Sequence, residues 1–265
     1  HKQLVLKNWM HRFFRGDDLE ELKKRLGDDR YEGIEDGHTI FFGQLTGQLF
    51  DHDLITSEEL TRYDQNIVRH WQEITRQRNR KEGETLRMKY FQYLSLLFSE
   101  IYLDWYFQRP ADLLAGLNEE LAIYNATAKK PEKFVPYLAE DLNKVAFWNA
   151  TGSGKTLLLH VNLRQYLERF AAHKPNGKSL PDKIIVLTPN EGLSRQHLRE
   201  LTDSGFASVH LFDKDHSSLP GSIEIIDVNK LGDEMGDKTV AVEAFEGHNL
   251  VLVDEVAHQS LPGPD

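Results

Sequence analysis

A glycine-rich loop that joins an apolar stretch to an amphipathic stretch constrains this chain more than any other feature. The segment reads Lys144-Val-Ala-Phe-Trp-Asn-Ala-Thr-Gly-Ser-Gly-Lys-Thr156. Its apolar first half predicts a strand, and the leucine spacing that follows it predicts a helix. Glycines at such a junction let the backbone turn with its N–H groups facing inward, where they can bind phosphate oxygens. The sequence therefore predicts a phosphate-binding loop at the N-terminus of a helix, a position that favours anions.

The end of this loop carries the side chains that a nucleoside triphosphate needs. We expect Lys155 to reach the β- and γ-phosphates and the Thr156 hydroxyl to bind Mg²⁺. The expected cofactors are therefore ATP and Mg²⁺. The loop residues expected to bind the nucleotide are Asn149, Thr151, Gly152, Ser153, Gly154, Lys155 and Thr156.

A second motif places two carboxylates after a short apolar run. Leu250–Val253 are four apolar residues, and Asp254 and Glu255 follow directly. This pattern predicts a buried parallel strand with both acids at its carboxyl end, where open α/β sheets bind ligands. Taken alone, the pattern also fits a strand that leaves the core. Together with the loop it predicts that Asp254 holds Mg²⁺ and that Glu255 orients and deprotonates the attacking water, so the expected catalytic residues are Lys155, Asp254 and Glu255.

These two motifs resemble motifs I and II of superfamily 2 helicases of the DEAD/DEAH-like group. Asn149 stands where other phosphate loops have their first glycine, and superfamily 2 commonly has no glycine there. The resemblance covers the C-terminal half of the chain. It is closest to the ATPase (motor) subunit of type I and type III restriction enzymes and to related bacterial defence helicases. It implies ATP-dependent translocation on nucleic acid, with duplex DNA preferred over RNA.

Motif II departs from the family pattern at its fourth position. The family has D-E-x-H or D-E-x-D, whereas this chain has Ala257 there and a histidine one residue later, His258. In the family the fourth residue couples the ATP site to the second domain. The resemblance therefore implies a coupling role for His258, reached through a local bulge, or for Gln259 or another group. A histidine that is simply exposed remains the alternative.

Two segments between these motifs resemble the parts of the family that contact the nucleic-acid track. Lys183–Leu201 contains an apolar run, a Thr-Pro-Asn turn and a helix pattern, similar to motif Ia, and Ser222–Leu231 reads as a strand that ends in polar groups. Contacts of this kind position a nucleic-acid backbone without reading its sequence. Each segment also fits a plain connection between a strand and a helix. The implied nucleic-acid contacts are Thr188, Pro189, Asn190, Gln196, Asn229 and Lys230.

The N-terminal half shows helical spacing and no strand alternation from Gln3 to about Asn125. The predicted fold is therefore α/β: an all-helical accessory domain over residues 1–135, followed over 136–265 by an incomplete first RecA-like domain with a parallel sheet. The apolar stretch Tyr90–Phe107 contains Glu100 and Asp104. Its uncharged run is shorter than the ~20 residues of a membrane span. It predicts a buried core helix and no membrane association.

Two features of the helical half allow a functional and a structural interpretation. Arg69–Lys81 is a basic run with a tryptophan, which suits a nucleic-acid backbone and also suits a solvated helix face. The segment Trp105–Asp112 lies where superfamily 2 enzymes often contact adenine, so the resemblance makes Phe107, Gln108 and Arg109 candidate adenine contacts. Core packing with a helix break at Pro110 is the alternative.

Composition and chain ends complete the prediction. The chain has no cysteine, which excludes disulfides and cysteine-ligated zinc, and shows no targeting segment, so we expect a bacterial-type cytoplasm. The net charge of −10 excludes a wholly basic coat but not a local positive groove. The chain begins at His1 and ends soon after motif II. We therefore expect a fragment that lacks the second RecA-like domain, hydrolyses ATP weakly on its own, and works with a nuclease or methyltransferase subunit.

Two other function classes are alternatives to a motor. A nucleotide-dependent switch or scaffold would use the helical domain to recruit protein partners, and the shifted His258 is compatible with it. A small-molecule kinase would need an arginine-rich substrate lid after the loop, which the sequence does not show. Stimulation of the ATPase by DNA distinguishes a motor from a switch.

Overall fold

The computed structural model describes most of the chain. The described residues are 4–14, 19–49, 54–127, 134–150, 152–213, 219–232, 240–241 and 246–254. Four of the predicted site residues lie outside this set, namely Thr151, Glu255, His258 and Gln259.

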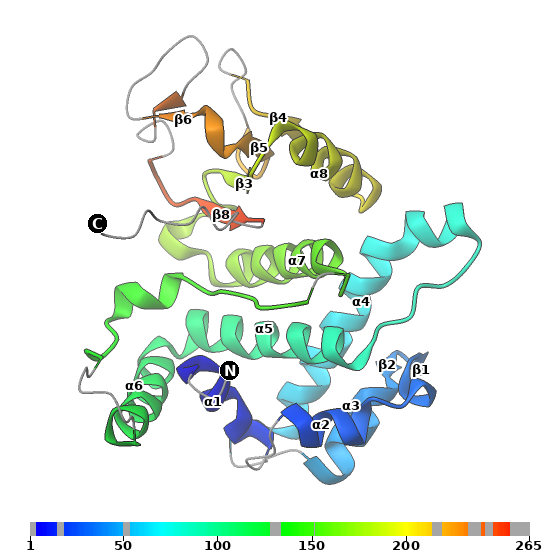
Figure 1. The fold of residues 1–265 in the computed structure, drawn as a ribbon, viewed down its shortest axis with the longest axis vertical. Coiled ribbons are helices and arrows are strands. Elements are labelled where there is room, and N and C mark those ends of the chain that lie inside the picture. The colour runs from blue at the N-terminus through cyan, green and yellow to red at the C-terminus, as the bar shows by residue number, and fades with distance from the viewer. Residues whose placement is uncertain are drawn as a thin grey trace, which may run out of the picture. The chain divides into compact units, whose positions relative to one another are not determined.

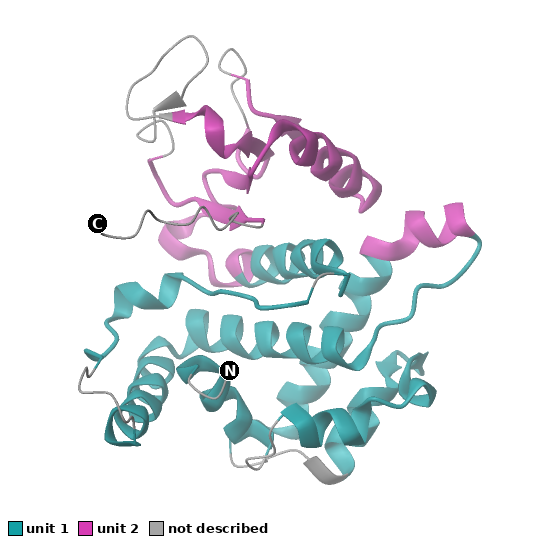
Figure 2. Cartoon of the chain, viewed as in Figure 1, with its two compact units in different colours: residues 1–73, 83–169 teal, residues 74–82, 170–265 magenta. Residues whose placement is uncertain are grey.

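The chain divides into two compact units, which Figure 2 shows in different colours. The first unit comprises residues 1–73 and 83–169, and the second comprises 74–82 and 170–265. The predicted domain boundary between residues 135 and 136 stays a prediction.

The first unit is mainly helical, in line with the helical region predicted for the N-terminal half of the chain (Figure 1). Its long helices are α4, which continues into the second unit, α5, α6 and most of α7. The helices of its described residues are α1 (Val5–His11), α2 (Leu19–Leu26), α3 (Ile40–Gln44), α4 (Ser57–Glu82), α5 (Tyr90–Gln108), α6 (Pro110–Thr127) and α7 (Lys155–His173), with 3-10 turns at Arg12–Phe14, Asp29–Tyr31 and Ala139–Asn143 and a π-helical turn at Leu45–Leu49.

The core of this unit is built around α5, which is apolar on most of its surface. Tyr93 and Leu97 on α5 are fully buried. Trp105, near the end of α5, packs edge-to-face against Trp9 of α1, with ring centroids 5.1 Å apart. Trp9 also meets α6, because its indole nitrogen lies against Gly116, where an added Cβ would clash with it. The predicted core helix is therefore confirmed, and among the described residues no helix is both long enough and apolar enough to cross a bilayer.

One element of this unit was not predicted. A short antiparallel hairpin joins β1 (Ile34–Glu35) to β2 (His38–Thr39). Its two turn residues, Asp36 and Gly37, both have positive φ, 50° and 80°. Asp-Gly is a common sequence for a type I′ hairpin turn, so the local signal was present although the flanking strands are too short to alternate.

The second unit is an α/β structure with a parallel sheet, as predicted. The sheet has the order β4-β5-β3-β8, and each neighbouring pair is parallel. Helix α8 (Glu191–Asp203) connects β3 to β4 and buries Ser194, His197 and Leu201. The strands are β3 (Ile184–Thr188), β4 (Val209–Leu211), β5 (Ile223–Asp227) and β8 (Leu250–Val253), with 3-10 turns at Pro175–Gly177 and Val228–Lys230 and a separate parallel pair of β6 (Leu231–Gly232) and β7 (Val240–Ala241).

The predicted strand before the glycine loop is wrong. Residues 144–150 have no strand assignment. Phe147 and Trp148 are 48% and 80% exposed, so their side chains do not contribute to a core. An apolar run becomes a stable strand only where neighbouring strands complete its hydrogen bonds, and the described sheet includes no partner for this segment.

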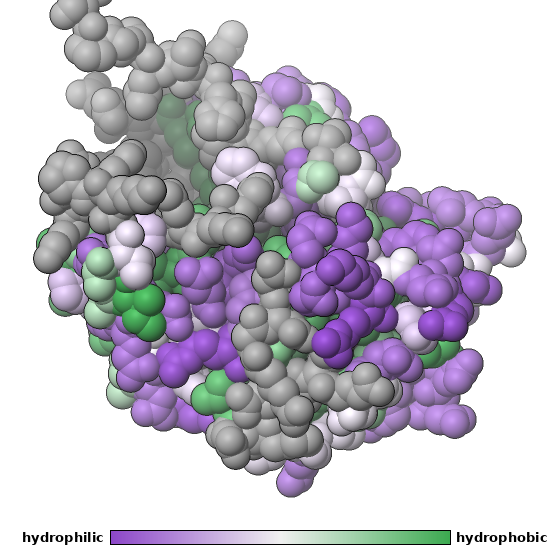
Figure 3. Space-filling model, turned by 60° about the horizontal axis from the view of Figure 1, so that its bottom comes forward, coloured by the Kyte–Doolittle hydropathy of each residue, from purple (hydrophilic) through white to green (hydrophobic). Residues whose placement is uncertain are grey.

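Hydrophilic residues make up most of the described surface in the view of Figure 3, and hydrophobic residues show there as small separate areas.

Candidate nucleotide site

The glycine loop has the backbone geometry of an anion-binding turn. Gly152 and Gly154 have φ of 78° and 81°, a region that residues with a side chain rarely adopt. Between them, the N–H of Ser153 donates to the Ala150 carbonyl at 3.1 Å. The Gly154 carbonyl accepts from Leu158 N at 3.1 Å, so Gly154 opens helix α7. Backbone turns of this kind form concave N–H sites for anions.

The start of α7 adds the charge and the hydroxyl that a polyphosphate needs. Lys155 and Thr156 are the first two residues of this helix, and both are half-buried, as is Asn149 before the loop. The first N–H groups of any helix lack intrahelical acceptors and carry the positive end of its dipole. The Ser153 hydroxyl oxygen is buried and has no hydrogen-bond partner among the described residues. A buried polar group of this kind is satisfied when a ligand oxygen reaches it, so the loop fits a nucleotide phosphate.

Gln92 supports the loop from α5 and was missed by the sequence analysis. Its Nε2 donates to the Ser153 carbonyl at 2.9 Å, and its Oε1 accepts from Lys89 N at 2.9 Å. The side chain lies close to the loop, because a Cβ at Gly154 would be 2.7 Å from Gln92 Nε2. Gln92 therefore fixes the loop backbone to the first turn of α5. The two contacting residues are far apart in the chain, so no local sequence pattern predicts their contact.

Replacing Gly154 with Ala is expected to weaken ATP binding by about tenfold. Holding a residue that has a side chain in the left-handed conformation costs about 1–2 kcal/mol. Each 1.4 kcal/mol corresponds to a factor of ten in affinity. The added Cβ also meets Nε2 of Gln92, so either that side chain or the loop must shift. The measurement is titration of a fluorescent ATP analogue. The matched control is Gly177→Ala. Gly177 also has a positive φ, 76°, but it lies outside the loop, and a Cβ added there would have no atom within 4 Å. Equal affinities for both variants would contradict the assigned loop geometry.

Asp254 is held at the carboxyl edge of the sheet in the second unit. Its N–H donates to the Leu187 carbonyl at 3.0 Å, which continues the ladder between β3 and β8 by one residue. Its Oδ2 lies 2.8 Å from Nε2 of His197 on α8. A carboxylate oxygen is a ligand that Mg²⁺ prefers, so Asp254 fits the predicted metal role by its chemistry. His197 is a second residue that the sequence analysis did not single out.

The predicted track-contacting residues other than Gln196 lie at the same edge of the sheet. Asn229 Nδ2 donates to the Pro189 carbonyl at 3.0 Å, so the turns after β3 and β5 are in contact. The exposed Asn190 caps α8, where its Oδ1 accepts from Leu193 N at 3.0 Å. Thr188 is buried, and its hydroxyl lies 2.6 Å from the Ser194 hydroxyl. Thr188 therefore stabilises the turn, whereas Asn190 and Asn229 are exposed at it.

The two remaining predicted track contacts, Gln196 and Lys230, are exposed. Gln196 projects from α8 and donates to Glu200 at 2.9 Å. Lys230 ends the 3-10 turn after β5. Their contact with nucleic acid stays a prediction.

The three candidate adenine contacts have protein partners in the first unit. Phe107 is buried against Tyr166, with ring centroids 5.6 Å apart. Gln108 Nε2 donates to Asp104 at 2.9 Å. Arg109 pairs with Glu59 at 3.2 Å, and α5 ends at Gln108 just before Pro110 opens α6. These contacts match the alternative of core packing and a helix break, and an adenine contact stays a prediction.

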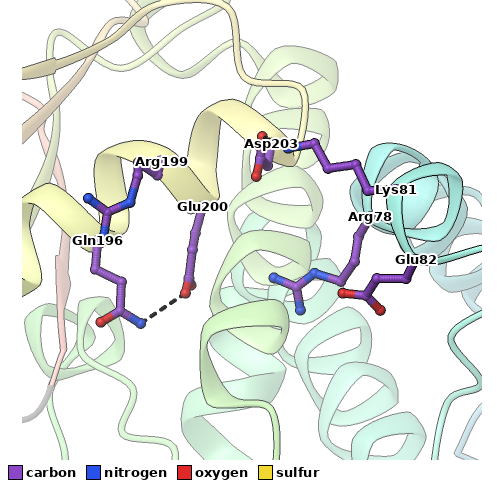
Figure 4. A pocket seen from close by; sticks show the side chains of 7 residues that line it. All are labelled: Arg78, Lys81, Glu82, Gln196, Arg199, Glu200 and Asp203. Carbon is purple, nitrogen blue, oxygen red and sulfur yellow. Dashed lines mark hydrogen bonds and ion pairs between the residues drawn. The ribbon is translucent and has the colours of Figure 1, made fainter.

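The basic run is partly neutralised by acidic partners. In the first unit Arg69 and His70 both contact Glu168, at 2.5 and 2.7 Å. In the second unit Lys81 contacts Asp203 at 2.7 Å. A pocket of about 450 Å³ is lined by the C-terminal end of α4 and by helix α8 (Figure 4). Its lining includes both basic and acidic side chains. Its lining residues are Arg78, Lys81, Glu82, Gln196, Arg199, Glu200 and Asp203.

The comparison with known families identifies a helicase-like ATPase domain of superfamily 2, as predicted. Residues 113–261 match the family described as "Type III restriction enzyme, res subunit". The match spans more than half of the chain and includes the loop, the segment after β3 and the motif at Asp254 and Glu255, so the chain belongs to this family. None of the curated proteins and none of the solved structures matches the chain.

Proposed function

We propose that this chain is part of an ATP-driven motor that translocates along nucleic acid, with duplex DNA as the preferred track, in a bacterial restriction or related defence system. The observation that carries the proposal is the family match, which runs through the glycine loop and the acidic motif. In this proposal residues 1–135 form a helical accessory domain and 136–265 form the first RecA-like domain. The partners are a second RecA-like domain and a nuclease or methyltransferase subunit, in the cytoplasm.

The chemistry assigned to the chain is ATP hydrolysis. The loop N–H groups and Lys155 bind the phosphates and offset their charge. Thr156 and Asp254 would hold Mg²⁺, which when bound neutralises charge on the phosphate oxygens. Glu255 orients a water molecule for attack and accepts its proton. Most of the rate enhancement in phosphoryl transfer comes from such positioning and charge stabilisation.

The track is assigned to the polar turns at the carboxyl edge of the sheet. The contact between Asn229 and Pro189 brings both turns together, and Asn190 and Lys230 are exposed beside them. Amide and lysine groups suit phosphate and sugar oxygens, and such contacts hold a strand without selecting a sequence. His258 or Gln259 is assigned the coupling of this edge to the ATP site.

The test is the ATPase rate of the full-length protein with duplex DNA, single-stranded DNA, RNA or no polymer. The salt concentration is kept low and the same throughout, because binding to nucleic acid is salt-dependent. Duplex DNA is expected to raise the rate clearly above the rates with single-stranded DNA, with RNA and with no polymer. Asp254→Asn is the control that removes hydrolysis without removing the polar turns. A rate indifferent to every polymer would favour a nucleotide-dependent switch whose helical domain recruits protein partners.

A further inference from the structure

His197 makes an unusual contact for a histidine on the buried face of a helix. Its side chain is 3% exposed, and it shares this face of α8 with Ser194 and Leu201. Its Nε2 lies 2.8 Å from Asp254 Oδ2. Because a carboxylate accepts hydrogen bonds and does not donate them, Nε2 is the donor. The contact joins residues 57 positions apart in the chain.

Packing alone does not account for this histidine. Its second ring nitrogen, Nδ1, is buried and has no hydrogen-bond partner among the described residues. A buried polar atom without a partner costs free energy, which an apolar side chain of similar size would avoid. The hydrogen bond that the ring does make is the one to Asp254. The position of the histidine is therefore explained by that carboxylate.

The helix that carries His197 is itself held firmly. Asn190 caps its N-terminus, and the Ser194 hydroxyl, one turn before His197, bonds to Thr188 at the end of β3. Leu201, one turn after His197, is fully buried. The backbone of Asp254 is fixed separately through its bond to Leu187 of β3. The carboxylate is thus fixed by the sheet through its backbone and by α8 through its side chain.

We propose that His197 is a positioning residue that holds the Asp254 carboxylate in the orientation needed to bind Mg²⁺. The inference rests on the proposed function, in which Asp254 holds the ion. Groups that hydrogen-bond to metal-ligating carboxylates restrict their orientation, and their loss typically reduces metal affinity by about 10- to 100-fold. Because α8 begins at the turn assigned to the track, His197 also connects that turn to the metal-binding acid.

The experiment measures binding of a non-hydrolysable fluorescent ATP analogue to the full-length protein, in EDTA and over a range of Mg²⁺ concentrations. His197→Leu and His197→Phe remove the donor, and Phe keeps a planar ring. Both are expected to bind the analogue normally in EDTA and to need about 10- to 100-fold more Mg²⁺ for the metal-dependent gain in affinity. His197→Gln, whose amide N–H can replace Nε2–H, is expected to restore most of the response to Mg²⁺.

A matched control separates positioning from general destabilisation. Leu201→Ala removes apolar atoms from the same face of α8, so it lowers the unfolding temperature but leaves the Mg²⁺ midpoint unchanged. The inference is overturned if folded His197→Leu or His197→Phe keeps the wild-type Mg²⁺ midpoint while Asp254→Asn raises it. It is also overturned if His197→Gln is as defective as the apolar variants. A wild-type midpoint in Asp254→Asn itself contradicts the metal role of Asp254, and with it the proposed function.

Discussion

Replacing Lys155 with Ala is expected to abolish ATP binding by the full-length protein. Lys155 is the first residue of α7, directly after the left-handed Gly154, so its backbone lies at the helix end where the helix dipole and the loop N–H groups favour an anion. Hydrogen bonds to charged groups contribute about 1.5–3 kcal/mol each. Loss of contacts to two phosphates is therefore expected to weaken binding by about 10²–10⁴-fold.

Titration of a fluorescent ATP analogue measures this loss. Lys144→Ala is the matched control, because it removes the same charge from an exposed position before the loop. It is expected to keep wild-type affinity. Unchanged affinity in Lys155→Ala would rule out the phosphate-binding loop, since no other role assigned to Lys155 would survive that result.

Replacing Arg169 with Met is expected to destabilise the first unit by about 3–5 kcal/mol, the usual cost of leaving buried charges without their partner. Arg169 on α7 donates to Asp104 at 2.5 Å and to Glu100 at 2.8 Å, both on α5. Each of these acids is 1% exposed. Methionine has a similar volume and cannot pair with either. The variant therefore keeps most of the packing and leaves the buried Glu100 without its ion-pair partner, whereas Asp104 keeps its contacts with Arg62 and Arg109.

Chemical denaturation at constant pH measures the loss, and an exposed ion pair provides the comparison. Arg195 pairs with Glu191 at 2.6 Å on the surface of α8. Removal of such a pair costs about 0–1 kcal/mol, so Arg195→Met should have a small effect. Adding Glu100→Gln to Arg169→Met should recover part of the loss, because the neutral amide is cheaper to bury. Similar losses in Arg169→Met and Arg195→Met would contradict the account of the buried network.

The pH dependence of the Arg169 variant gives a second signature. Burial raises the pKa of Glu100, and the charge of Arg169 opposes that rise. Without the arginine the pKa of Glu100 in the folded protein should rise further. A carboxyl group with a raised folded pKa favours the folded state when it is protonated and loses that contribution as the pH rises through the folded pKa. Arg169→Met should therefore lose less stability relative to wild type at pH 5 than at pH 7.

The sequence predicted those parts of the fold and site that depend on local patterns. The leucine spacing after Lys155 predicted α7, and the apolar runs before Thr188, Asp227 and Asp254 predicted three parallel strands. The glycine positions predicted the turn, because the need for positive φ is local. The one strand predicted wrongly, at residues 144–150, has an apolar pattern but no neighbouring strand in the described sheet.

The contacts that fix the candidate site could not be predicted in this way. Gln92 reaches the loop from 61 residues away, and His197 reaches Asp254 from 57 residues away. Glu100 was visible as a charge within an apolar helix, but its partner Arg169 lies 69 residues later. Hydrophobic periodicity reports which face of a helix is buried, and it carries no information about which polar side chains meet across elements.

Translocation along duplex DNA is tested most directly by displacement of a third strand, bound as a triplex, at increasing distances from the site where the full-length protein loads. We expect displacement only with ATP and Mg²⁺, after a delay that grows in proportion to the distance. Lys155→Ala should give none. Absence of displacement from a protein that binds duplex DNA and hydrolyses ATP, or a delay that does not change with distance, would contradict the proposed motor.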